Sequence, residues 1–305
     1  KKRVEIYFQF DGLKASNYVQ LRGESLLETK LAALEALGAA GVNVTLVSTL
    51  QTGVNTDQVG DLIRFAMERP FVTGVSFQPA TYSGRYFLPD DLENRVTFPD
   101  VVRAIANQAN EYFADRDFLP LPCAHPNGHV LAYAFRSEGE AVPLNRFVDL
   151  ERNMDLLANG IVFTRERARS LVNEYVSRSC GTGCDSSLSL PILSAEKEDA
   201  MVQQSSPQVQ RMAGKFLELA MGGKIQQADL LRVTITSFMD AYNFDVRQLM
   251  KSCVHFVLPS GHIIPFSAYN VLYRDGHVPL PLLTDIQNLP ATQKASRSGS
   301  LSAKP

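Results

Sequence analysis

VNVTLVSTLQTGVNTDQVGDLIRFAMERPFVTGVSFQ, residues 42–78, is the stretch of sequence that decides the fold. Val42 to Leu50 is apolar and β-branched, which is typical of a buried strand. Gly53-Val54-Asn55 then turns the chain into a helix that Pro70 ends, and the apolar stripe of this helix is Val59, Leu62, Ile63 and Ala66. Phe71 to Gln78 repeats the strand signature. The stretch therefore predicts a strand, a helix and a second strand.

The same alternation continues on both sides of this unit. Val4 to Asp11 alternates between two faces, as a strand does. Ser25 and Glu28 form a capping-box pattern that predicts the start of a helix, and Thr97 is expected to cap a third helix that runs to about Phe113. The first third of the chain therefore reads βαβαβα, which predicts a parallel sheet, either open or part of a barrel.

The remainder of the chain is less regular. A strand is expected from Val130 to Phe135 and a helix from about Arg165 to Ser177, among loops rich in Pro and Gly. The last fifteen residues, 291–305, are polar and rich in Ser and Lys, which predicts a disordered tail. We therefore expect three parts: a βα region at 1–119, a C-terminal extension at 120–290, and the tail at 291–305.

Composition and charge exclude several classes of protein. The chain has 305 residues, 45% hydrophobic and 20% charged, which is ordinary for a packed globular protein. Its 30 Lys+Arg against 32 Asp+Glu give a formal net charge of −2, so no overall basic field would attract nucleic acid. There is no apolar run of about 18 residues that could span a membrane. We expect a soluble, cytoplasmic protein that does not bind nucleic acid.

Motifs narrow the chemistry further. Neither a G-x-G-x-x-G after a strand nor a G-x-x-x-x-G-K-[ST] is present, which disfavours a standard dinucleotide site and a P-loop ATPase. G-x-S-x-G and H-E-x-x-H are also missing, so simple hydrolases lose support. Polar residues instead stand at or just beyond the expected strand ends, where parallel α/β folds gather functional groups; they are Asp11, Thr49, Asn55 and Gln78.

The four cysteines, Cys123, Cys180, Cys184 and Cys253, are too scattered for a disulfide scaffold. Cys123 shares a loop with His125 and His129, so this loop is either a metal site or a buried thiol beside surface histidines. Cys253 precedes a stretch that resembles a hairpin, which is either structural or metal-binding. Cys180 and Cys184 have C-x3-C spacing, but Ser187 stands where a third thiolate of a C-x3-C-x2-C loop would lie. A flexible loop without iron is the simpler interpretation.

A set of short motifs resembles one known family. The sequence is similar to the second half of a radical S-adenosylmethionine domain, in the branch that includes the archaeal tetraether lipid synthases. The motifs that carry the resemblance are Tyr7-Phe8-Gln9-Phe10-Asp11-Gly12, Leu21-Arg22-Gly23, Lys30, Leu46-Val47-Ser48-Thr49, Gly53-Val54-Asn55, Gly60, Phe77-Gln78-Pro79, Gly84-Arg85, Pro122-Cys123 with His125-Pro126, and Cys253 through Pro265-Phe266 and Tyr269-Asn270 to Tyr273-Arg274. The match covers much of residues 4–275 and is loose over 150–240.

The resemblance implies the C-terminal half of a partial parallel (β/α) barrel, followed by an irregular α+β extension. It implies S-adenosylmethionine and a [4Fe–4S] cluster as cofactors, and an enzyme that abstracts hydrogen with a 5′-deoxyadenosyl radical. C–C bond formation or alkylation of an apolar substrate would follow, with a small-molecule or lipid substrate and an electron donor such as ferredoxin or flavodoxin. The residues implied to face the cofactor are Gln9, Asp11, Thr49, Asn55 and Gln78.

The resemblance also implies that Cys123 and Cys253 descend from ligands of auxiliary iron–sulfur clusters. Gly128 and Ser267 stand where further cysteines are expected, so these clusters are lost, incomplete or completed by Cys180 and Cys184. The C-x3-C-x2-C motif of the main cluster is not in the chain. We therefore interpret the sequence as the C-terminal portion of a longer radical enzyme. The alternative is a degenerate, noncatalytic binding module.

Overall fold

The computed structural model describes residues 6–83, 86, 88, 91–148, 150, 174, 206–280 and 282–283. The predicted helix at 165–177, apart from residue 174, lies outside the described residues, as do the predicted tail at 291–305, Cys180 and Cys184. The chain divides into two compact units, 1–81 with 87–238, and 82–86 with 239–305. The predicted boundaries at 119 and 290 stay predictions. In the described residues no helix has the length and apolar character that crossing a membrane requires.

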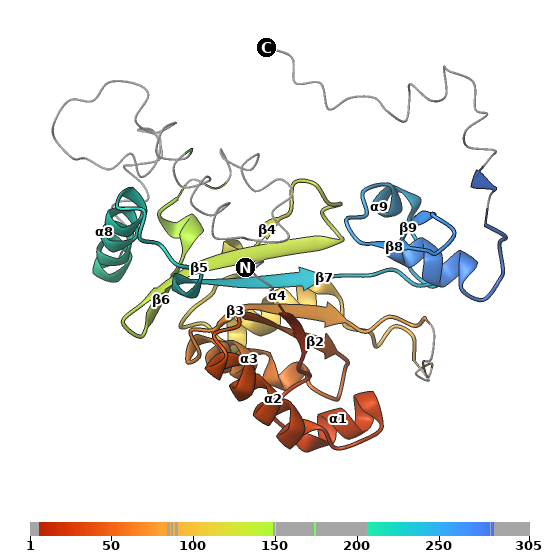
Figure 1. Ribbon diagram of the computed structural model, residues 1–305, viewed down its shortest axis with the longest axis horizontal. Coiled ribbons are helices and arrows are strands. Elements are labelled where there is room, and N and C mark those ends of the chain that lie inside the picture. Colours follow the sequence, from red (N-terminus) through yellow and green to blue (C-terminus); the bar gives the residue numbers. More distant parts are fainter. Residues whose placement is uncertain are drawn as a thin grey trace, which may run out of the picture. The chain divides into compact units, whose positions relative to one another are not determined.

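The first unit is built on one mixed sheet of seven strands (Figure 1). Its strands follow the order β1-β2-β3-β7-β5-β4, with β6 beside β5. The first four of these run parallel, while β5 is antiparallel to β7, β4 and β6. The bounds are Ile6–Gln9 (β1), Val44–Leu50 (β2), Val72–Pro79 (β3), Leu119–Pro120 (β4), His129–Ser137 (β5), Glu140–Pro143 (β6) and Leu230–Thr236 (β7). The predicted α/β class with parallel strands is confirmed.

Helices follow the early strands as predicted, but the structure has one helix more than predicted, and another helix begins at a different residue than predicted. The bounds are Ala15–Arg22 (α1), Leu27–Ala39 (α2), Val59–Met67 (α3), Phe98–Gln108 (α4) and Pro207–Met221 (α8). Thr97 caps α4 in a capping box with Asp100, as predicted. The predicted box at Ser25 is wrong, because α2 begins after Leu26, whose side chain caps nothing. Helix α1 precedes it and is absent from the sequence prediction.

The two faces of the sheet differ in chemistry. Phe10, Leu46 and Phe77 belong to the apolar core, to which α2, α3 and α4 also contribute (Figure 1). Because side chains alternate along a strand, the residues between them share the opposite face. That face is mainly polar: it carries Tyr7, Gln9, Thr45, Thr49, Ser76, Gln78, Arg232, Thr234, Thr236 and His129, which follow the register of β1, β2, β3, β7 and β5. We call it the polar face.

The second unit is small. Its described elements are α9 (Val246–Met250), the hairpin β8 (His255–Val257) and β9 (Ile263–Pro265), α10 (Phe266–Ala268) and a π-helical turn at Tyr269–Tyr273. Phe256 stacks on Phe266 with ring centroids 5.1 Å apart. The buried Asp240 carboxylate accepts hydrogen bonds from the backbone N–H groups of Tyr82 and Tyr242. The predicted hairpin after Cys253 is confirmed.

Candidate functional site

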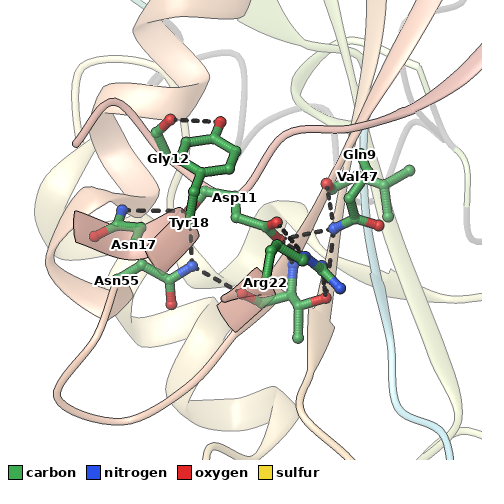
Figure 2. A network of polar contacts seen from close by, with 9 residues as sticks. Gln9, Asp11, Gly12, Asn17, Tyr18, Arg22, Val47 and Asn55 are labelled. Atoms are coloured by element: carbon green, nitrogen blue, oxygen red, sulfur yellow. Dashed lines mark hydrogen bonds and ion pairs between the residues drawn. The ribbon is translucent and has the colours of Figure 1, made fainter. Parts of the chain in front are cut away.

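A network of polar side chains lies where β1 and β2 end, at the carboxyl edge of the parallel strands (Figure 2). Four of the five predicted cofactor residues, Gln9, Asp11, Thr49 and Asn55, are joined in it. They come together because the parallel pairing of β1 with β2 sets Gln9 beside Val47, two residues before Thr49. The expectation that strand-end residues gather at one edge is met for these four.

Asp11 is the centre of the network. Its side chain is fully buried. The Oδ1 atom accepts hydrogen bonds from Gln9 Nε2 at 2.7 Å and from the Thr49 backbone N–H at 3.0 Å. A buried carboxylate is stable only when it is paired and hydrogen-bonded, and Asp11 meets both conditions through the arginine described next. Asp11 therefore holds the neighbouring side chains in place, and its carboxylate is not free to bind a ligand.

Arg22 supplies the counter-charge and is absent from the predicted site residues. Its Nε donates to Asp11 Oδ2 at 2.8 Å and its Nη2 to Asp11 Oδ1 at 3.0 Å, which is a bidentate pair. Nη2 also donates to Thr49 Oγ1 at 3.0 Å. The Arg22 side chain remains 32% exposed, whereas that of Asp11 is 0% exposed. Arg22 is thus the charged group of the network that faces solvent.

Sequence reasoning missed Arg22 for a physical reason. It is the last residue of α1, a helix with only Asn17 and Tyr18 buried, so no apolar stripe reveals it. The available signal is Gly23, which ends the helix in the left-handed conformation at φ 84° and is a common helix stop. Reading Arg22-Gly23 as a helix end would have placed a cation in the last turn, close to the strand end that precedes it.

Asn55 holds the two strand ends together. Its Nδ2 donates to the backbone carbonyls of Asp11 and Thr49, both at 2.8 Å, and its Oδ1 accepts from the Gln51 N–H at 3.0 Å. The side chain is fully buried. Both amide protons are therefore used by the protein itself, which makes Asn55 a positioning residue rather than a group that contacts a ligand.

The turn after β1 is tightly built. Gly12 has φ 145°, and a Cβ atom on it would lie 2.2 Å from Asn17 Nδ2. The Tyr18 hydroxyl donates to the Gly12 carbonyl at 2.9 Å. Burial, followed by the nearby Asp11 charge, raises the pKa of Tyr18, so the phenol stays protonated and keeps this bond. The Asp11-Gly12 turn is thus fixed before any ligand arrives.

Gln78, the fifth predicted residue, lies on the neighbouring strand. It pairs with Thr49 in the register of β2 and β3 and is half-buried. Its side chain makes no hydrogen bond to another of the residues that the structure describes. Gln78 therefore stands about one strand spacing, ~4.8 Å, from Thr49, with its amide available on the polar face.

The predicted metal ligands are placed differently. Cys123 belongs to the first unit and Cys253 to the second, and both are half-buried without a disulfide. Among the described residues no group of three or more His, Cys, Asp or Glu could hold a metal ion. The described donors therefore do not fit a [4Fe–4S] cluster, which takes four thiolates or three with an open iron position.

The two departures from the cysteine pattern have structural roles. The Ser267 hydroxyl is buried and accepts a hydrogen bond from the Met239 N–H at 3.0 Å. The Gly128 carbonyl accepts from the Ser237 N–H at 2.9 Å and continues the pairing of β5 with β7. Both positions serve the backbone hydrogen-bond pattern rather than an iron site.

Comparison with known proteins identifies a relative of this chain. No protein-family model matches the chain. The chain is 31% identical, over 296 residues, to 7,8-dihydro-6-hydroxymethylpterin dimethyltransferase from Methanocaldococcus jannaschii. The alignment takes in 88% of this chain and 56% of the dimethyltransferase, so the chain spans about half of that protein's length. This similarity supports a relationship of the chain to the radical S-adenosylmethionine superfamily.

Proposed function

We propose that the carboxyl edge of β1, β2 and β3 binds S-adenosylmethionine in a radical enzyme that forms a C–C bond or alkylates a carbon atom. The observation that supports this most directly is the bidentate Asp11–Arg22 pair, which holds a partly exposed cation beside Thr49 at the strand ends. When bound, S-adenosylmethionine supplies a methyl sulfonium group and, on one-electron reduction, the 5′-deoxyadenosyl radical that abstracts hydrogen.

The residues of the edge suit such a ligand in kind. Thr49 and Gln78 offer a neutral hydroxyl and a neutral amide, which are partners that ribose hydroxyls and a purine ring require. Gln9 offers its Oε1, because its Nε2 already donates to Asp11 and to the Val47 carbonyl. Arg22 offers the positive charge that a carboxylate requires. Asp11 and Asn55 hold these groups in place through the contacts described above. In this proposal Asp11 and Asn55 position the edge, and the side chains that they hold in place bind the ligand.

The proposal includes the fold and the cluster. The parallel strands β1, β2 and β3 would form half of a partial (β/α) barrel, completed by further βα units outside these 305 residues. The thiolates of the [4Fe–4S] cluster would lie in the same outside part, because the 305 residues contain no C-x3-C-x2-C motif. A carrier such as ferredoxin or flavodoxin would supply the electron. The 56% coverage of the dimethyltransferase supports a protein of greater length.

The substrate class follows from the relative rather than from the sheet. The dimethyltransferase is named for a pterin, a small polar heterocycle. The polar face described here carries amides and hydroxyls, which suit a polar substrate better than a lipid chain. We therefore propose carbon alkylation of a small-molecule substrate, and a lipid is the less favoured alternative.

One observation favours a second function. Ser267 and Gly128 are committed to backbone hydrogen bonds at positions where auxiliary-cluster cysteines are expected. A protein that has lost its clusters would act as a noncatalytic binding module. Iron and sulfide analysis of the full-length protein, purified anaerobically, separates the two: stoichiometric iron and sulfide support the enzyme, and their absence after reconstitution supports the module.

The binding site is tested by calorimetric titration of S-adenosylmethionine into the protein under anaerobic conditions. Gln78→Leu and Thr49→Val are expected to weaken binding by about tenfold each, which is the loss of one hydrogen bond to a polar ligand. The matched controls are Gln20→Leu and Thr29→Val, exposed positions on α1 and α2. Equal affinities for all four variants would overturn the assignment of the site.

A further inference from the structure

A second polar pair lies on the same face of the sheet, beyond the proposed cofactor site. His129 on β5 and Thr236 on β7 are directly opposite in the antiparallel register, and His129 Nδ1 lies 2.8 Å from Thr236 Oγ1. β7 is the strand next to β3, so His129 lies two strands from Gln78, which is about 10 Å at ~4.8 Å per strand. Neither His129 nor Thr236 is one of the five predicted cofactor residues.

The other nitrogen of the ring is shielded and unused. His129 Nε2 is out of contact with solvent, and no group within the described residues forms a hydrogen bond to it. A buried polar atom that has no partner destabilises the fold unless a ligand supplies one. Thr236 fixes the ring through Nδ1, so Nε2 has a set direction even though it lacks a protein partner. Such an atom is suited to a hydrogen bond from a ligand.

The surroundings decide what kind of ligand this is. Burial, followed by the charge of Arg232 on β7, lowers the pKa of His129 to about 4, so the ring is neutral at pH 7. A neutral imidazole has one donor nitrogen and one acceptor nitrogen, so with Nδ1 bonded to Thr236 the Nε2 atom acts as a single donor or a single acceptor, and the ring has no charge for a phosphate or carboxylate. In the register of the sheet, the residues between His129 and Thr49 are Thr236 on β7 and Gln78 on β3, and all four are half-buried. Hydroxyl and amide groups along this row are partners for the polar edge of a heterocyclic ring.

We propose that His129, positioned by Thr236, binds a neutral amide or ring nitrogen of a planar heterocyclic substrate on the β7–β5 side of the polar face. The proposal rests on the proposed function for the place of the cofactor, at β1, β2 and β3. It divides the polar face in two: the parallel edge holds S-adenosylmethionine, and the His129–Thr236 pair orients the substrate beside it.

The test uses 6-hydroxymethyl-7,8-dihydropterin and S-adenosylmethionine as separate titrants on the same protein. His129→Phe keeps a ring of similar size without nitrogen, and it is expected to weaken pterin binding at least about tenfold while the affinity for S-adenosylmethionine stays within about twofold. His129→Gln keeps a neutral hydrogen-bonding group and is expected to retain most of the pterin affinity. His255→Phe, at an exposed position of the second unit, is the control.

A spectroscopic measurement on the unaltered protein separates binding from a structural role. With ¹⁵N-labelled histidine, pterin is expected to shift the Nε2 resonance of His129, assigned through His129→Gln, and to leave the other four histidines unmoved. An unchanged resonance, or full pterin affinity in His129→Phe, would overturn the role of His129. Binding of S-adenosylmethionine without any binding of pterin would overturn the substrate class alone. If the protein fails to bind S-adenosylmethionine, the proposed function fails instead.

Discussion

Two arginines at opposite ends of the same sheet show two different uses of a guanidinium group. Arg22 lies where β1 and β2 end and binds the side chains of Asp11 and Thr49. Arg136, near the C-terminal end of β5, is buried and donates only to backbone carbonyls, those of Ala66, Pro70, Val72 and Ala228, at 2.6–3.0 Å. One arginine organises side chains at an open edge, and the other joins backbone segments inside the fold.

The difference indicates at which end of the sheet polar side chains are available to a ligand. Arg136 links the end of α3 to the start of β3 and to the 3-10 turn before β7, so its donors are occupied by the fold itself. Burial lowers the pKa of Arg136 to about 10, which still leaves it charged at pH 7. Arg22 is partly exposed and bonds side chains, which are able to exchange partners with a ligand. In our proposal the Arg136 end serves the fold and the Arg22 end binds the cofactor.

The largest effect is expected at Arg136. Arg136→Leu leaves several buried carbonyls without donors and should lower the free energy of unfolding by about 3–5 kcal/mol, measured by urea denaturation. Arg103→Leu removes an exposed pair with Asp100 and should cost less than about 1 kcal/mol. Affinity for S-adenosylmethionine should be unchanged in the folded fraction of both variants. An Arg136 variant as stable as the Arg103 variant would remove the contrast on which the comparison stands.

Asp11 should affect both stability and binding. Asp11→Ala removes the buried carboxylate that accepts from Arg22, from Gln9 and from the Thr49 N–H, so we expect a loss of about 2–4 kcal/mol in unfolding free energy. Affinity for S-adenosylmethionine should fall at least about tenfold. Asp57→Ala breaks only the exposed pair with Lys14 and is the control, with both quantities nearly unchanged. Normal binding by a folded Asp11→Ala protein would place the cofactor site elsewhere.

Gly12 tests how strictly the turn must be built. Gly12→Ala adds a Cβ that would lie 2.2 Å from the buried Asn17 amide at a φ of 145°, so a loss of about 2–3 kcal/mol is expected in thermal or urea unfolding. Gly23→Ala carries only the left-handed φ of 84° with open space around it, and should cost about 1 kcal/mol. Equal losses in the two variants would show that the contact with Asn17 does not affect the unfolding free energy.

The last prediction concerns pH. The pKa of His129 in the folded protein, about 4, lies below its ordinary value of 6.5, so the unfolded chain takes up a proton first as the pH falls. His129 therefore contributes nothing to the pH dependence of stability above pH 6.5 and destabilises the fold progressively from pH 6.5 to about 4. The slope is at most about 1.4 kcal/mol per pH unit.

The measurement is unfolding free energy against pH for the protein and for His129→Gln, with His255→Gln as the control. The His129 variant should lose less stability than the parent between pH 6.5 and 4, whereas the His255 variant should follow the parent. Parallel curves for all three proteins would mean that His129 is not held neutral by burial.

Part of the fold and of the site could be predicted from local pattern. β2, α3 and β3 follow from apolar periodicity with Gly53 and Pro70 as punctuation, and Thr97 caps α4 as its sequence indicates. Gln9, Asp11, Thr49 and Asn55 could be grouped because parallel strands end at one edge. Arg22 could not, because α1 has no apolar stripe that would place the helix.

Local sequence by itself determined the βα order, the polar strand ends and the absence of common nucleotide motifs, because these depend on residues within one or two turns of each other. Only the tertiary structure decided that β7 lies between β3 and β5, that Asn55 serves the backbone, and that His129 faces the polar side of the sheet. β3 and β7 are separated by about 150 residues of chain, and no short-range pattern records a pairing over that distance. Long-range strand pairing is set by the burial of the whole sheet, and it is this pairing that turns scattered polar residues into one face.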